Sequence, residues 1–336
     1  MGISRIGAPL PHGRSSVSVR GSALLAVLWV SAALAAIAFS LSTTVRGETE
    51  RTSTAVDGLR SYYLASGAIY RATYELLWSV ENPGKRVIPQ GSTHVDYTFP
   101  SGDVRVELIP EAAKLDVNAT PPEELYRLGV ALGLEPERAR ETALSIADWR
   151  SPPGPGALDS YYLSLEPSFR PRHASVEEIE ELLLVKGITP EIFYGTYVPT
   201  PDPSQGTRLV RRPGLIDCLS VFGSSSRIEA NTASPAVLAA IGMAPDVINA
   251  LVEERRKKPF TYQKLLEFLQ SFGASAARLR IEGNSIITMR ATARVRLQNG
   301  QLSDLKRTVG ALVKYMPVGY DAPIHILRWY DTTWSN

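Results

Sequence analysis

The sequence predicts an α+β fold in which a small antiparallel sheet is interrupted by a large all-helical insertion. Three observations carry this prediction. A helical pattern without proline fills most of the first eighty residues, and alternating apolar runs occur near residues 95–109 and 286–330. The stretch between these runs, 111–285, carries almost only helix starts and stops.

The composition sets the outer bounds. The chain has 336 residues, and 36 Lys and Arg against 34 Asp and Glu leave a formal charge of +2, which gives no general reason to expect polyanion binding. A hydrophobic share of 44% supports a sizeable core. The single cysteine, Cys218, excludes an intrachain disulfide and Cys-rich zinc sites. We expect it to be a buried small hydrophobe rather than a nucleophile.

Residues 23–41 form an apolar segment that can cross a bilayer. At about 1.5 Å per residue, this helix just spans a hydrocarbon core of about 30 Å. Three arginines and no acid precede it, and two glutamates follow closely, so the short N-terminal flank is expected to stay cytoplasmic and the body to be exported. A removed secretory signal is the alternative, because Ala36-Ile37-Ala38 resembles a small-residue cleavage site.

The helix is expected to continue well beyond the apolar segment. No proline occurs between residues 12 and 82, so one helix from about Ala23 to Trp78 is permitted, and Asn82-Pro83-Gly84 ends it. Its second part predicts one amphipathic stripe. The stripe consists of Val56, Leu59, Tyr63, Ile69, Tyr70, Thr73, Leu76 and Leu77.

Two hairpins and one further strand are predicted for the sheet. The first hairpin pairs residues 95–99 with 104–109 around a Pro-Ser-Gly-Asp turn. The second pairs 286–297 with 305–315, because Asn299-Gly300 is a strong hairpin signal. Residues 324–330 are expected to add a last strand.

Helix punctuation dominates the insertion. Thr120, Thr189 and Ser234 each precede proline and are expected to cap helices. Gly187 is expected to close a helix that begins near Val176, and the proline-rich stretch 198–214 is expected to be a linker with a boundary near 210. A weak repeat relates residues 115–125 to 228–238, each read as an extended piece, an Asn turn and a capped helix.

The N-terminal region resembles a type IV prepilin. A basic leader that ends in Arg20-Gly21 precedes a small residue and an apolar helix, and the resemblance implies cleavage between Gly21 and Ser22 by prepilin peptidase. Most pilins have glutamate at the fifth mature position, where this chain has Ala26. The minor pseudopilin K (GspK) family of type II secretion lacks that glutamate.

Further motifs support the resemblance to the GspK family from residue 20 to about 315. These are both repeat copies, Asp148-Trp149, Tyr161-Tyr162, Phe169-Arg170-Pro171 and the stretch 183–191. The implied fold is pilin-like: a long N-terminal helix packs on a small antiparallel sheet, and the insertion forms two subdomains similar to SAM or helix-hairpin-helix units. The expected division is a leader 1–21, the long helix 22–82, first strands 83–110, helical subdomains 111–210 and 211–285, and C-terminal strands 286–336.

The resemblance also implies a function. The chain would be a single-pass inner-membrane protein with its bulk in the periplasm, and it would cap and help initiate the pseudopilus at its tip. The implied partners are the I-type and J-type minor pseudopilins, the major pseudopilin, prepilin peptidase and the secretion machinery. No nucleic acid is expected as a partner.

Calcium is the one cofactor that the resemblance raises. The family carries calcium in an acidic loop, which corresponds here to residues 148–159. Calcium takes about six to eight oxygen ligands, often several carboxylates, whereas this stretch offers only Asp148 and Asp159. Ser151 and Leu158 stand where relatives have acids. We therefore expect structural roles for the two aspartates, with calcium possible but not assigned.

A membrane-anchored DNA-uptake protein is the rival interpretation. Residues 231–269 also resemble a helix-hairpin-helix unit, whose Gly-hydrophobic-Gly hairpin holds a phosphate. Here the hairpin reads Gly242-Met243-Ala244, and the extra Cβ hinders a close backbone approach. The candidate phosphate-binding cations are Arg255, Arg256, Lys257 and Lys258. A solvated helix end explains these cations equally well, and the near-neutral charge of the chain favours a structural subdomain.

Catalysis is not indicated by the sequence. The four histidines, His12, His94, His173 and His325, show no metal-protease spacing, and none of the common nucleotide or hydrolase motifs occurs. We expect His173, which lies beside Arg170 and Arg172, to be a solvated surface residue.

Overall fold

The computed structural model describes residues 20–89, 91–152, 154, 156–199, 209–281, 285–316 and 323–333. The chain divides into two compact units, Met1–Asp57 and Gly58–Asn336. The first unit consists, in its described part, of the N-terminal portion of one helix. The second unit contains the rest of that helix, the sheet and the insertion.

Helix α1 spans Arg20–Glu81, so the predicted long helix is confirmed. A short 3₁₀ turn, η1, follows at Pro83–Lys85. Within the second unit, the buried residues of α1 on the sheet are mostly small: Ala65, Ala68, Ile69 and Ala72 are inaccessible to solvent. Small side chains allow a helix to approach a sheet closely, so this face of α1 packs directly on the sheet.

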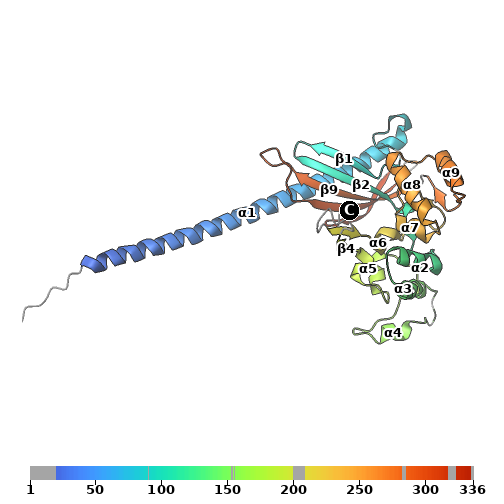
Figure 1. The fold of residues 1–336 in the computed structure, drawn as a ribbon, viewed down its shortest axis with the longest axis horizontal. Helices are drawn as coiled ribbons and strands as arrows, with labels where there is room; N and C mark the ends of the chain where they lie inside the picture. Colours follow the sequence, from blue (N-terminus) through green and yellow to red (C-terminus); the bar gives the residue numbers. More distant parts are fainter. Residues whose placement is uncertain are drawn as a thin grey trace, which may run out of the picture. The chain divides into compact units, whose positions relative to one another are not determined.

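The sheet has five strands in the order β1-β2-β9-β10-β11, and all neighbours are antiparallel (Figure 1). The strands are β1 His94–Phe99, β2 Gly102–Pro110, β9 Ile286–Val295, β10 Arg307–Tyr315 and β11 Ile324–Tyr330. The predicted hairpins and last strand are therefore confirmed. The sheet residues that alternate toward α1, such as Val106, Met289 and Ala311, form one hydrophobic core with it.

The insertion, which we call the head, begins after the end of β2 and ends before the start of β9. Pro110 lies opposite Ile287 in the ladder, so the head enters between two neighbouring strands. Its helices are η2 Glu111–Ala113, α2 Pro122–Ala131, α3 Pro136–Trp149, α4 Asp159–Leu163, η3 Ile179–Leu184, α5 Pro190–Tyr194, α6 Leu215–Cys218, α7 Pro235–Ala240, α8 Pro245–Lys257 and α9 Tyr262–Ser271.

Short strand pairs supplement the helices of the head. They are β3 Leu115–Asp116 with β6 Leu219–Ser220, β4 Thr196–Pro199 with β5 Leu209–Arg212, and β7 Ile228–Glu229 with β8 Leu279–Arg280. The α+β fold class is confirmed, and these pairs add strand to an insertion that the sequence describes as all-helical. Pairs of two to four residues carry too little periodicity to be predicted.

Several local predictions need correction. Thr120 does not cap α2, because its hydroxyl donates to the Asp116 carbonyl oxygen at 2.6 Å and Pro121 takes the cap position. The helix expected from Val176 is the 3₁₀ turn η3. Part of the expected linker forms the antiparallel pair β4–β5, while residues 200–208 lie outside the described residues. Ser234 does cap α7, accepting from the N–H of Val237 at 3.2 Å.

One hydrophobic cluster runs through the whole head, from Ala113 to Leu279. It includes Phe193 and Leu215, which lie on opposite sides of residue 210 in the sequence. The expected division of the head near 210 stays a prediction about sequence organisation, since both halves contribute to one core.

Candidate functional site

The first unit presents the membrane-spanning candidate. Among the described residues, α1 is the one helix long and apolar enough to cross a membrane, and its side chains from residue 22 to 41 are exposed in the free chain. Ser31 is tolerated because its hydroxyl donates to the carbonyl oxygen of Val27 within the helix. Ala26 is exposed on this segment and brings no charge to it. An exposed apolar helix of this length requires lipid or other apolar helices around it.

The expected cleavage site lies at the start of α1. Gly21 and Ser22 belong to its first turn, whereas residues 1–19 of the expected leader lie outside the described residues. Cleavage between Gly21 and Ser22 stays a prediction.

The predicted stripe of α1 divides between two faces. Ile69 and Thr73 are buried against the sheet, and Leu76 and Leu77 are half-buried. By contrast, Tyr63 is 66% exposed, and Val56, Leu59 and Tyr70 are exposed as well. The single-stripe prediction was therefore wrong, because small residues rather than the largest ones face the sheet. We call the exposed set the outer stripe: Val56, Leu59, Tyr63, Tyr70 and Tyr74.

The two halves of the head each contain a helix-hairpin-helix arrangement. Helix α2 packs against α3 and also against α7, which packs against α8. Figure 1 shows α2, α3 and α7 grouped together. Gly133 and Gly242 close the first helix of each pair with φ of 80° and 92°, values that glycine adopts readily. The repeat detected in the sequence thus corresponds to a repeated structural unit.

The four candidate DNA-binding cations do not form a free basic surface. Arg255 donates to the carbonyl oxygen of Ala230 at 2.8 Å, and burial lowers its pKa. Arg256 and Lys257 pair with glutamates one turn earlier on α8, at 2.7 and 2.9 Å. Lys258 is exposed at the end of the helix. These pairings favour the structural interpretation, and nothing in this region specifically favours the DNA-binding one.

Asp148 and Asp159 lie at the two ends of one loop, between α3 and α4. Oδ1 of Asp148 accepts from the backbone N–H of Ala157 at 2.8 Å, and Oδ1 of Asp159 lies 2.7 Å from Nε2 of His173. Pro153 and Pro155 of the same stretch lie outside the described residues. His173 was expected on the surface, and this expectation was wrong, because the residue is buried. Its adjacent arginines suggested solvent, and the loop that covers it left no signal in the sequence.

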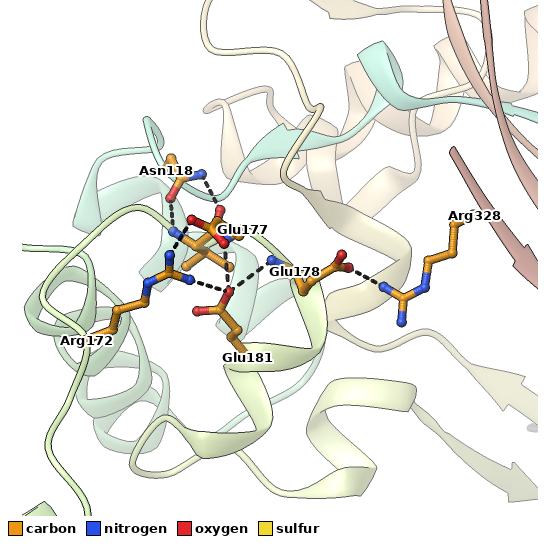
Figure 2. Close-up of polar contacts among 7 residues, drawn as sticks. Asn118, Arg172, Glu177, Glu178, Glu181 and Arg328 are labelled. Carbon is orange, nitrogen blue, oxygen red and sulfur yellow. Dashed lines mark hydrogen bonds and ion pairs between the residues drawn. The ribbon is translucent and has the colours of Figure 1, made fainter. Parts of the chain in front are cut away.

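A polar network connects the head to the sheet (Figure 2). Arg328 of β11 contacts the carboxylates of Glu178 and Glu180, the second at 2.9 Å. Glu181 accepts from the backbone N–H groups of Glu177 and Glu178 at 2.9 and 3.0 Å, which shapes the start of η3. The C-terminal strand is thereby linked to the helical head through exposed and half-exposed charges.

A second, more buried set of charges crosses the same boundary. Arg290 of β9 pairs with Glu107 at 2.9 Å and with Asp217 at 3.8 Å, and Asp217 also pairs with Arg211 at 2.7 Å. Between these contacts lies a cavity of about 680 Å³, bounded by sheet residues such as Thr288 and by head residues. The charged groups on its walls include these ion pairs, while apolar side chains such as Ile109, Ile216 and Leu312 make up most of the lining.

Cys218 is fully buried, as expected. Burial raises the pKa of its thiol to about 12. The thiol is protonated at neutral pH, which does not suit a nucleophile.

The first half of the head matches a known family. Residues 108–195 match the family described as type II secretion system (T2SS), protein K. This stretch is therefore similar to the protein K family. The fold is also similar to a chain in the crystal structure of the GspK-GspI-GspJ complex from the enterotoxigenic Escherichia coli type 2 secretion system. That similarity has a TM-score of 0.55 at 17% identity and covers 85% of this chain and 100% of that chain. No curated protein matches the sequence.

The chain is GspK-like in domain content and in fold, as the family resemblance indicated. The pilin-like arrangement of α1 on an antiparallel sheet agrees with this assignment. The apolar part of α1 fits a single-pass anchor of the inner membrane. The GspK-like chain thus combines a membrane-competent helix with a large head inserted into its sheet.

Proposed function

We propose that this GspK-like minor pseudopilin helps to initiate a type II secretion pseudopilus and caps its tip. The observation that carries the proposal is the division of α1 into two faces. Its small residues pack on its own sheet, while the apolar side chains of the membrane segment and of the outer stripe are exposed in the described part of the chain, with Tyr70 also stacked on Trp329. Such a helix can exchange lipid for the helices of other subunits.

The proposed partners are the I-type and J-type minor pseudopilins and the major pseudopilin. The similar solved structure is a complex of GspK with GspI and GspJ, which supports the first two. Before assembly, the helix holds the chain in the inner membrane with the sheet and head in the periplasm. Prepilin peptidase is expected to release the leader before assembly.

Ala26 supports the tip position. In other pilins, by family resemblance, the glutamate at this place pairs with the terminal amine of the subunit ahead. A subunit with alanine there cannot make that pair, so it needs no neighbour above it. The head adds bulk to the subunit, which would hinder addition of another subunit beyond it.

The leader is tested by N-terminal sequencing of the membrane-bound protein with and without prepilin peptidase. A start at Ser22 that requires the peptidase supports the pseudopilin assignment. A start after Ala38 would identify a soluble exported protein, and an uncut chain in the presence of peptidase would identify an ordinary anchor.

The capping role is tested by removing the head. Because Pro110 lies opposite Ile287, residues 112–285 can be replaced by an Asn-Gly turn that joins β2 to β9 as a hairpin. The core between α1 and the sheet lies outside the deletion, so circular dichroism can verify that the remainder folds. We expect longer pseudopili when the major pseudopilin is overproduced. Unchanged fibre length and secretion with a folded headless variant would contradict the cap.

A further inference from the structure

The imidazole ring of His173 lies inside the loop that joins α3 to α4. Only 8% of the residue is exposed, and its φ of 47° is in the left-handed region, which residues other than glycine seldom adopt. Nε2 lies 2.7 Å from Oδ1 of Asp159. Nδ1 lies 3.2 Å from Oγ of Ser151 and 3.3 Å from the carbonyl oxygen of Asp148. The ring therefore contacts both ends of the loop.

The partners of both ring nitrogens are placed to accept hydrogen bonds. The Asp159 carboxylate and the Asp148 carbonyl oxygen have no proton to donate. The hydroxyl of Ser151 donates to that same carbonyl oxygen at 2.7 Å. The hydrogen bond to Asp159 raises the pKa of His173 and lowers that of Asp159.

The loop is shaped around this ring. A Cβ atom at Gly156 would lie 2.4 Å from Cε1 of His173, so a larger residue there would displace the imidazole. The next residue, Ala157, donates its N–H to Asp148, and Asp159 follows two positions later. Two contacts thus join the ends of the loop. The Asp148 carboxylate accepts from the backbone N–H of Ala157, and the His173 imidazole contacts the Asp159 carboxylate.

These contacts do not fit a calcium ion. Six to eight oxygens are needed, whereas each of the two carboxylates already uses an oxygen within the loop. Leu158 packs against the core of the head. Among the described residues, no group of three or more His, Cys, Asp or Glu side chains could hold a metal ion.

We propose that the side chain of His173 closes the 148–159 loop through its contacts with Asp159, Ser151 and Asp148, in place of the metal ion that the family resemblance implies there. The head then folds without calcium. His173 is a positioning residue that fixes the turn from α3 into α4, and Gly156 provides the space for its ring.

The test is hydrogen exchange of the full chain in detergent, with calcium or with EGTA, read from the peptide that covers residues 156–164. We expect identical exchange in both conditions for the wild-type chain. His173→Gln should exchange at least about tenfold faster in this peptide, because local opening becomes easier. Gly156→Ala should act in the same direction. His325→Gln, a change at an exposed residue of β11, is the matched control and should leave the peptide unchanged.

Peptides from β9 and β10 show in the same experiment whether each variant remains folded. Slower exchange of the loop with calcium in the wild-type chain would overturn the proposal, and this arm needs no variant. Unchanged exchange in a folded His173→Gln variant would overturn it as well. Neither measurement involves secretion or fibre assembly, so the outcome is independent of the proposed capping role.

Discussion

Asn118 and Asn231 hold equivalent positions in the two halves of the head and make the same pair of hydrogen bonds. Asn118 donates to the carbonyl oxygen of Val176 at 3.0 Å and accepts from its N–H at 2.7 Å. Figure 2 labels Asn118 and marks its hydrogen bonds with dashed lines. Asn231 makes the same two hydrogen bonds with Phe260, at 3.1 and 2.7 Å. Each side-chain amide thus bonds both backbone groups of one distant residue, as a neighbouring β-strand would. It thereby connects that residue's segment to the repeat.

Loss of these amides should destabilise the head. A buried backbone group left without its partner costs about 1–3 kcal/mol, so Asn231→Ala is expected to lower the free energy of unfolding by about that amount. Asn118 is half-buried, and Asn118→Ala should cost less because water can reach the freed groups. Urea denaturation measures both. Asn249→Ala, at an exposed position of α8, is the control and should be neutral; an equal loss there would contradict the prediction.

The sequence predicted the repeats and the turns at their asparagines, but not the hydrogen bonds that the two side chains make. Local pattern identified a turn residue, which is what asparagine commonly is. The partners, Val176 and Phe260, lie 58 and 29 residues away, and no local rule can indicate such pairs. The same limit explains His173, whose burial depends on a loop that ends fourteen residues earlier.

The long helix and the sheet were predictable because their signals are periodic. Strand β11 was predicted with its observed bounds, since the run Ile324–Tyr330 is rich in residues that favour strands. The faces of α1 were not predictable, because Ala65, Ala68 and Ala72 are weakly hydrophobic and Tyr63 is strongly so. How closely a helix face can approach the sheet decides which face packs on it. A second, exposed apolar face indicates that the helix contacts another partner.

Two arginines at the boundary of sheet and head should differ in their contribution to stability. The side chain of Arg290 is 6% exposed, and Arg290→Met would leave the Glu107 carboxylate, whose side chain is 20% exposed, without its cation, at a cost of up to about 3–5 kcal/mol. The side chain of Arg328 is 37% exposed, so Arg328→Met should cost less than about 1 kcal/mol. Chemical denaturation of both variants is the measurement. Equal losses would show that burial does not govern these ion pairs.

The raised pKa of Tyr97 predicts that the folded chain loses stability at high pH. Burial and the hydrogen bond to Glu75, at 2.5 Å, raise the pKa of Tyr97 well above its usual value near 10. The folded chain therefore keeps the phenol protonated, while the unfolded chain releases the proton above about pH 10. The stabilisation is complete below that pH and is lost as pH rises toward the folded pKa.

Tyr97→Phe should remove this dependence. The variant should be less stable at pH 8, because Glu75 loses a donor, but should lose less stability between pH 9 and 11 than the wild-type chain. Urea denaturation across this range gives the comparison, and Tyr74→Phe, at an exposed position of α1, should keep the wild-type slope. A Tyr97→Phe curve parallel to the wild type would refute the assignment.

The outer stripe of α1 should carry subunit contacts rather than stability. Tyr63 is 66% exposed, so Tyr63→Asp is expected to leave the free energy of unfolding within about 0.5 kcal/mol, as surface changes usually do. In a complex, the same change would bury a carboxylate against apolar helices, which costs several kcal/mol unless it is paired. Co-purification with I-type and J-type pseudopilins should therefore fall at least about tenfold. Tyr197→Asp, at a tyrosine of the head that is 57% exposed, provides the matched control and should co-purify normally. If both variants bind equally well, the second apolar face of α1 has another purpose and the proposed packing among pseudopilins loses its main support.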